Sequence, residues 1–284
     1  MAVPNYVVTL RCVDAPGIVL ATSSAIVALG GNILENDQFT DPVTGQFCMR
    51  TRFETEIDDG DAVRTRLGDE LERFGPTLGV RHEEVRRRAL VMVSKYDHCL
   101  ADLLFRREQG DLPLDIVAVV SNHPDCAALA ARYQVHFHLI PVGPSTKQRA
   151  EDELRELLAQ YGVDFVVLAR YMQVLSPALC AELSGRIINI HHSFLPGFKG
   201  AKPYHQAYER GVKLIGATAH FVTDALDEGP IIEQDVVRVS HARQPGDLVA
   251  LGRDIERSVL SRAVRLVSED RVALVGRRTV IFSQ

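Results

Sequence analysis

Several features that would mark a specialised class of protein are missing from this sequence. Its 284 residues include no tryptophan, and 32 basic and 37 acidic side chains give a formal net charge of -5. Nonspecific binding to nucleic acid generally depends on an excess of positive charge, so we expect no nucleic-acid partner. No apolar run is long enough to cross a bilayer, and we expect no association with membranes.

Paired cysteines are also missing. The five cysteines are scattered and include no Cys-x-x-Cys pair, which is typical of a protein from a reducing compartment rather than of a disulfide scaffold. The chain begins with Met-Ala-Val-Pro-Asn and shows neither the basic segment nor the apolar core of a secretory signal. We therefore expect a cytoplasmic location and a small molecule as the partner.

The length and an ordinary globular composition, with 46% hydrophobic and 24% charged residues, predict two domains. The hydrophobic pattern from residue 6 to residue 84 follows the order strand, helix, strand, strand, helix, strand. This order predicts a ferredoxin-like α+β domain over residues 1–84. Strands are expected at residues 6–12, 32–39, 47–56 and 80–84, and helices at residues 18–29 and 61–74.

The second domain, residues 85–284, shows apolar strands that alternate with helices. Strands that are apolar on both faces predict a Rossmann-like, mostly parallel sheet with helices on each side. Ligands bind beyond the carboxyl ends of the strands in such sheets. The expected strands are residues 89–94, 116–121, 136–140, 165–169 and 186–191, followed by extended segments at 216–222 and 231–239, a helix at 245–268 and a final hairpin.

Two polar residues stand at the carboxyl end of the expected strand 186–191. Asn189 and His191 are two positions apart, so their side chains project from the same face of the strand. A buried polar group without a partner costs about 1 to 3 kcal/mol. These residues therefore indicate either a functional site or hydrogen bonds to neighbouring backbone groups, and their spacing favours neither interpretation.

A second polar cluster follows the strand that contains His220. Asp224, Asp227 and Glu228 crowd a short turn, and turns favour Asp and Gly for conformational reasons alone. In isolation, an exposed loop is the better interpretation of these acids. Their spacing does not single out one carboxylate as a functional group.

Together, the two segments resemble the active-site region of formyltransferases that use formyltetrahydrofolate. The family pattern is Asn-x-His, then Ser-x-Leu-Pro, then His-Phe-Val-x-x-x-x-Asp-x-Gly, and this sequence matches it at Asn189, His191, Ser193, Leu195, Pro196, His220, Asp227 and Gly229. In this family the Asn, the His and the Asp are catalytic, so the resemblance implies these roles for Asn189, His191 and Asp227. The resemblance also implies a substrate-binding role for Met172, Gln173, Val174, Leu175, Val222 and Thr223.

The acceptor of the formyl group is a separate question. Glycinamide ribonucleotide formyltransferases have a Gly- and Ser-rich turn for phosphate after the first strand of this domain, whereas this sequence has Ser94-Lys-Tyr-Asp-His-Cys99. A segment without glycine and with an acid at Asp97 is a poor phosphate site. The chain also ends without the basic RNA-binding domain of methionyl-tRNA formyltransferases, so we expect water to be the acceptor.

The first domain supports this expectation. Asp14-Ala-Pro-Gly17 resembles the ligand loop of ACT domains, which pair across subunits and bind amino acids. An ACT domain ahead of a formyltransferase-like domain is the arrangement of formyltetrahydrofolate deformylases, and this resemblance covers nearly the whole chain. It implies hydrolysis of 10-formyltetrahydrofolate to tetrahydrofolate and formate, which supplies purine synthesis and balances the one-carbon folate pools. It further implies effector binding at Asp14 and Gly17, a homo-oligomer formed by ACT pairing, and no metal or cofactor, since folate is the substrate.

Other functions remain as alternatives. The formyl group could pass to glycinamide ribonucleotide or another amine, or the chain could bind folate or an amino acid without turnover. The presence of Asn189, His191 and Asp227 together argues against a protein that only binds. The number of histidines suggests metal-dependent hydrolysis, but the sequence has no H-E-x-x-H motif. Cys99 beside His98 suggests a thiol nucleophile, for which no oxyanion hole is indicated.

Overall fold

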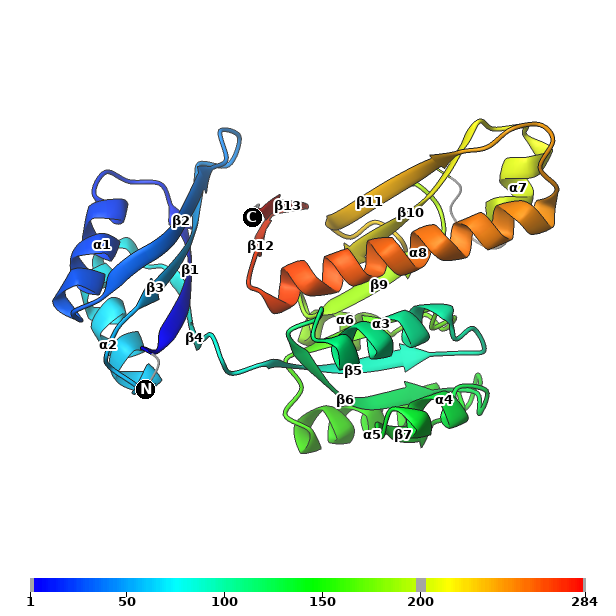
Figure 1. Cartoon of the computed structure of the whole chain (residues 1–284), viewed down its shortest axis with the longest axis horizontal. Helices are drawn as coiled ribbons and strands as arrows, with labels where there is room; N and C mark the ends of the chain where they lie inside the picture. Colours follow the sequence, from blue (N-terminus) through cyan, green and yellow to red (C-terminus); the bar gives the residue numbers. More distant parts are fainter. Residues whose placement is uncertain (1–2, 198–202, 283–284) are drawn as a thin grey trace. The chain divides into compact units, whose positions relative to one another are not determined.

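The computed structural model describes residues 3–197 and 203–282, and the chain divides into two compact units (Figure 1). Unit 1 comprises Met1–Arg86 together with Glu269–Gln284, and unit 2 comprises Arg87–Ser268. The junction after Arg86 lies two residues beyond the boundary expected from the sequence. The C-terminal residues differ from the expectation, because Glu269–Gln284 group with unit 1 and not with the second domain.

Unit 1 has the expected ferredoxin-like order of elements. Its antiparallel sheet follows the strand order β2-β3-β1-β4, and Figure 1 shows α1 and α2 on the same face of this sheet. The elements are β1 (Asn5–Val13), α1 (Ile18–Ala28), β2 (Asn32–Thr40), β3 (Gln46–Glu54), α2 (Gly60–Leu71), the 3-10 helix η1 (Glu72–Phe74) and β4 (Thr77–His82).

The core of unit 1 follows from the alternation of side chains along its strands. Tyr6 and Val8 are buried on the helix-covered face of β1, where they pack in one cluster with Ile26 of α1 and Leu67 of α2. Alternate residues of a strand point to opposite faces of the sheet. The apolar positions of β1 therefore require a helical layer on one face, which α1 and α2 supply.

A C-terminal hairpin covers the other face of this sheet. Cys48 of β3 is fully buried and packs with Val275 and Phe282, and Arg11 of β1 donates a hydrogen bond of 2.8 Å to the carbonyl oxygen of Leu274. The hairpin strands are β12 (Val272–Val275) and β13 (Arg278–Ile281). The hairpin belongs to unit 1 because it buries apolar surface there, although it follows unit 2 in the sequence.

Ion pairs join the start of this C-terminal segment to the sheet. Arg81 of β4 pairs with Asp270 at 2.6 Å, and both side chains are nearly buried. Arg50 and Arg271 both pair with Glu35, at 3.0 and 3.2 Å. Partly buried pairs of this kind are screened less by solvent than exposed ones, so they add to the apolar contacts of the hairpin.

Unit 2 has the expected mostly parallel sheet, in the order β11-β10-β9-β8-β5-β6-β7. The pairs among β5 to β9 are parallel, whereas β10 and β11 are antiparallel. Its elements are β5 (Arg87–Val93), α3 (His98–Gln109), β6 (Leu114–Ser121), α4 (Ala127–Arg132), β7 (His136–Leu139), α5 (Lys147–Gln160), β8 (Phe165–Leu168), α6 (Pro177–Glu182), β9 (Ile187–His191), α7 (Pro203–Glu209), β10 (Leu214–Phe221), β11 (Ile231–Arg238) and α8 (Pro245–Ser268).

Helices cover both faces of the sheet in unit 2. Leu154 of α5 and Leu179 of α6 pack with Leu90, Met92 and Leu168 of the sheet. On the opposite face α8 packs against α3, β9, β10 and β11, and Figure 1 shows this long helix running along β10 and β11. Strands extend from β5 in two directions, to β6 and to β8, and ligands bind at the carboxyl ends of strands near such a switch point. Among the described residues, no helix has both the length and the apolar character to cross a membrane.

We expect truncation of a core leucine to destabilise unit 1. Leu67 is fully buried, so Leu67→Ala should cost about 2–5 kcal/mol of the free energy of unfolding. The matched control is Leu20→Ala in α1, where the side chain is 70% exposed and the change should stay within about 0.5 kcal/mol. Hydrogen exchange of the β1 amides measures both effects, and equal protection in the two variants would contradict the core described here.

Candidate active site

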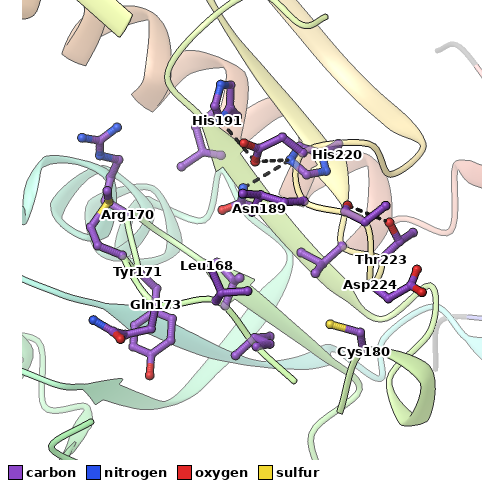
Figure 2. A pocket seen from close by; sticks show the side chains of 18 of the residues that line it. Leu168, Arg170, Tyr171, Gln173, Cys180, Asn189, His191, His220, Thr223 and Asp224 are labelled. Atoms are coloured by element: carbon purple, nitrogen blue, oxygen red, sulfur yellow. Dashed lines mark hydrogen bonds and ion pairs between the residues drawn. The ribbon is translucent and has the colours of Figure 1, made fainter. Parts of the chain in front are cut away.

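A pocket of about 980 Å³, open solvent included, lies at the carboxyl ends of β8 and β9. Three segments form its wall: the loop after β8, the end of β9, and the turn after β10. Figure 2 shows side chains from these segments around one space. The pocket brings together every site residue expected in this domain: Asn189, His191, Asp227, Met172, Gln173, Val174, Leu175, Val222 and Thr223.

Asn189 and His220 face each other across two paired strands. The antiparallel register places His220 of β10 opposite Asn189 of β9, and the Asn189 Nδ2 lies 3.2 Å from the His220 Nε2 (Figure 2). The His220 Nδ1 lies 2.9 Å from the carbonyl oxygen of Phe221, which only accepts. This network assigns the proton of the ring to Nδ1, so that Nε2 accepts a hydrogen bond from the Asn189 amide.

Burial also keeps the His220 ring neutral. Desolvation lowers the pKa of His220, and this effect outweighs the opposing influence of the Phe221 carbonyl and of Asp227. A neutral ring with a free lone pair on Nε2 can hold the Asn189 amide in one orientation. One N–H of that amide is then used by His220, and the second is left for a ligand.

Asp227 reaches the pocket from a turn with a restricted backbone. Its φ of 57° is left-handed, a conformation that Asp and Asn adopt more readily than most residues with a side chain. A Cβ atom at Gly229 would lie 1.7 Å from the carbonyl oxygen of Phe221, so that position accepts only glycine. The Asp227 side chain is 9% exposed, whereas Asp224 and Glu228 are exposed. The fold therefore distinguishes the three acids that sequence spacing leaves equivalent.

Histidines surround the Asp227 carboxylate. Its Oδ1 lies 3.3 Å from the His191 Nδ1 and 3.9 Å from the His220 Nε2. Burial raises the pKa of Asp227, but its hydrogen bond with His191 and its electrostatic interactions with the neighbouring histidines bring the net pKa below the usual value. Asp227 is therefore ionised at neutral pH. Its interactions stabilise the fold above the pKa of an unfolded Asp, and this contribution is lost as the pH falls through the lower folded-state pKa.

The loop between β8 and α6 is tied down at both ends. The backbone N–H of Met172 donates to the Ser94 Oγ at 3.0 Å. The backbone N–H of Ser176 donates to Glu151 at 2.7 Å, and the Ser176 hydroxyl donates to the other oxygen of the same carboxylate. Burial, followed by the charge of Glu151, raises the pKa of Tyr171 to about 12, so its phenol stays protonated. The loop thus presents a preformed, mainly uncharged wall to a ligand.

A second buried carboxylate lies beside the pocket. Glu256 of α8 accepts hydrogen bonds from the Tyr204 hydroxyl at 2.7 Å and from the His98 Nε2 at 2.8 Å. Burial raises the pKa of Glu256, but His98, Arg170 and Tyr204 outweigh burial and lower it. Glu256 is therefore an ionised carboxylate with donors on both oxygens.

The same region contains the thiol considered as a nucleophile. His98, Cys99 and Glu256 form the one group found among the described residues whose ligand atoms are close enough to hold a metal ion. Burial, and then the charge of Glu256, raises the pKa of Cys99 well above its usual value. A protonated thiol is a weak nucleophile, which argues against that role for Cys99.

Sequence reasoning gave no role to two residues of this site. His220 was noted in the family pattern, but strand pairing, which brings it to Asn189, is not visible in a single sequence. Arg170 lines the pocket with a left-handed φ of 68°, a strain of about 1–3 kcal/mol for a residue with a side chain. Arg170 begins the segment 170–177, which resembles the pterin loop of the family, but sequence analysis assigned no role to the Arg170 side chain itself.

The expected effector residues lie in unit 1. Asp14 is exposed, and its backbone N–H donates to the carbonyl oxygen of Gly45 at 2.9 Å. Gly17 precedes α1 with a left-handed φ of 96°, and a Cβ atom there would lie 3.7 Å from the Arg73 side chain. The backbone conformation at this turn therefore favours glycine. Effector binding at Asp14 and Gly17 stays a prediction.

Known proteins resemble this chain along nearly its whole length. It is 51% identical over 280 residues to a formyltetrahydrofolate deformylase of Corynebacterium sp. (strain P-1), with 98% of each chain covered. The crystal structure of a formyltetrahydrofolate deformylase from Burkholderia mallei has a TM-score of 0.95 and 49% identity, and the match covers 99% of this chain and 100% of that chain.

Unit 2 by itself has a wider set of relatives. The model of the formyl transferase family matches residues 87–264. A glycinamide ribonucleotide transformylase from Symbiobacterium toebii matches with a TM-score of 0.66 and 33% identity, covering 70% of this chain and 95% of its own. The deformylases, in contrast, match both units. From the geometry of the site and the extent of these matches, we conclude that this chain belongs to the formyltetrahydrofolate deformylase family.

Proposed function

We infer that this chain is a hydrolase that converts 10-formyltetrahydrofolate and water to tetrahydrofolate and formate. The observation that carries this function is the convergence of Asn189, His191 and Asp227 on one preformed pocket, in a chain that is similar to deformylases over both of its units. The acceptor is water, so the reaction needs an activated water molecule, a donor to the formyl oxygen and a proton for the departing N10.

Asn189 is the donor to the formyl oxygen in this proposal. Negative charge builds on that oxygen when water attacks the carbonyl carbon, and preorganised donors aimed at it stabilise the transition state. His220 accepts one N–H of the Asn189 amide, which keeps the carboxamide from turning its oxygen toward the substrate. His220 is therefore a positioning residue that acts through Asn189.

Asp227 and His191 divide the proton transfers. The Asp227 carboxylate orients the water and accepts a proton as the oxygen bonds to the formyl carbon. His191, held by its contact of 3.3 Å with Asp227, donates a proton to N10 as the C–N bond breaks. Asp227 then passes its proton to His191, which lies 3.3 Å away, so that both groups return to their starting states. Formic acid releases its remaining acidic proton to solvent, so the products are tetrahydrofolate, formate and one proton.

The folate rests against the uncharged wall in this proposal. Met172 to Leu175 and the pair Val222 and Thr223 line one pocket with the three catalytic residues, which would place the pterin against the loop after β8. We also propose that no metal or cofactor takes part. This proposal is supported by Glu256, because both oxygens of its carboxylate already accept hydrogen bonds.

We further propose that unit 1 senses an amino acid at Asp14 and Gly17 and pairs with a second copy to form a homo-oligomer in the cytoplasm. The ferredoxin-like fold of unit 1 and the tight turn at Gly17 support the sensing role. All five cysteines are free and buried, in keeping with a reducing compartment.

The first prediction concerns the acceptor. Purified protein with 10-formyltetrahydrofolate alone should release tetrahydrofolate and formate in equal amounts, because no acceptor other than water is needed. Added chelator should leave the rate unchanged. Strict dependence on glycinamide ribonucleotide would identify a transferase instead, and a loss of rate that zinc restores would identify a metallohydrolase.

The second prediction concerns Asp227. Asp227→Asn removes the base but suits the left-handed backbone, so single-turnover rates should fall at least about 100-fold while folate affinity changes much less. Asp224→Asn, a matched change in the same turn at an exposed position, should have little effect. A binding titration beside the rate assay separates lost affinity from lost chemistry. The assignment is wrong if Asp224→Asn loses turnover and Asp227→Asn keeps it.

The third prediction concerns regulation. A calorimetric screen of the twenty amino acids should find one that binds unit 1 and alters turnover. Such coupling is reciprocal, so bound folate should change the affinity for the amino acid by the same factor. The exchange Asp14→Asn should weaken amino-acid binding and leave basal turnover unchanged. The absence of any binding at millimolar concentrations would remove the sensing hypothesis.

A further inference from the structure

Arg170 is a buried cation whose hydrogen bonds are not satisfied by the protein. Its Nε and Nη1 atoms are buried and have no hydrogen-bond partner among the described residues. The nearest carboxylate oxygen, of Glu256, lies 3.6 Å from Nε, which is too far for a hydrogen bond. A buried donor left unpaired is costly, so this arginine needs an explanation.

Glu256 does not supply what Arg170 lacks. One oxygen of its carboxylate is engaged by the Tyr204 hydroxyl and the other by His98, so the carboxylate balances the charge of Arg170 without accepting from it. The ring of Tyr96 lies 5.3 Å from the guanidinium carbon, and cation–π attraction favours this position. The guanidinium is therefore held in place with donors to spare.

Arg170 lies in the wall of two neighbouring cavities. It lines the catalytic pocket with Asn189 and Asp227, and it also lines a neighbouring cavity of about 720 Å³ with Tyr96 and Glu256. Figure 2 shows its guanidinium projecting away from Tyr171 and Gln173, which point to the other side of the loop. The cation thus lies beside the reacting groups but off the wall assigned to the folate.

His192 links the cation to the reacting groups. It lines both cavities, and its ring lies 5.2 Å from the ring of His191. Burial, and then the positive charge of Arg170, lowers the pKa of His192 to about 3. The ring is therefore neutral at pH 7 and does not compete with Arg170 for an anion.

We propose that Arg170 forms a product subsite that receives the formate anion when it leaves the catalytic centre. Hydrolysis breaks the C–N bond, N10 takes up a proton, and formic acid loses a proton to become a carboxylate beside the ionised Asp227. Repulsion from Asp227 drives this anion away, and Arg170 offers two unused donors and a positive charge in the wall that the two cavities share. The neighbouring cavity then serves as the exit path for formate. This inference rests on the proposed hydrolysis.

The test uses formate itself as the probe. [13C]formate is titrated against the full-length protein without folate, and line broadening gives its affinity without any turnover. The variant Arg170→Met removes the charge and keeps the length, and it should weaken formate binding about 10- to 100-fold, as expected for loss of a charge-assisted hydrogen bond. Arg257→Met is the matched control, because the side chain of this arginine of α8 is 43% exposed and lines neither cavity. It should leave formate binding within about twofold.

Each outcome decides the proposal. Formate that does not saturate the wild-type protein, equal binding by wild type and Arg170→Met, or equal losses in Arg170→Met and Arg257→Met would overturn it. Inorganic phosphate that binds more tightly than formate and depends on Arg170 would also overturn it, in favour of a phosphorylated ligand. If Arg170→Met does not fold, Arg170→Lys takes its place, because lysine keeps the charge but lacks the planar set of donors. Formate binding that is several-fold weaker in Arg170→Lys supports the proposal, and unchanged formate binding overturns it. Formate binding in a protein without deformylase activity would separate this subsite from the proposed function.

Discussion

The antiparallel pairing of β10 with β9 is the constraint on which the site depends. β9 belongs to the parallel part of the sheet, and only the reversal at β10 places His220 beside Asn189. The same reversal starts the turn that carries Asp227, and the close approach of Gly229 to Phe221 holds that turn against the strand end. One strand pair thus orients the amide, the neutral imidazole and the carboxylate together.

Local patterns were sufficient to predict most of the fold. Period-two and helical patterns identified the elements of both units, because the apolar side of each element must be buried. The C-terminal hairpin was not assigned to unit 1, since its partner Cys48 lies more than two hundred residues away in the sequence. A contact between residues so far apart in the sequence produces no periodic hydrophobic pattern in either segment.

The site could be predicted in part. Asn189, His191 and Asp227 came from a family pattern, not from spacing, and the choice among three acids required the backbone of the turn. The role of His220 depends on strand register, and the role of Arg170 depends on its unpaired donors. Both are properties of the three-dimensional structure. The ion pair between Arg170 and Glu256 could not be predicted from the sequence either, because Arg170 lies on the loop after β8 and Glu256 lies on α8.

The C-terminal hairpin makes unit 1 discontinuous, which bears on how the protein is made and cut. During synthesis the sheet of unit 1 emerges before unit 2, but the segment that covers Cys48 follows unit 2 in the sequence. Unit 1 is therefore finished only after the whole of unit 2 has been translated. A fragment that stops at Arg86 would expose an apolar face and would leave Arg81 without the Asp270 carboxylate. Separation of the two units by recombinant expression therefore requires a graft of residues 269–284 onto the first fragment.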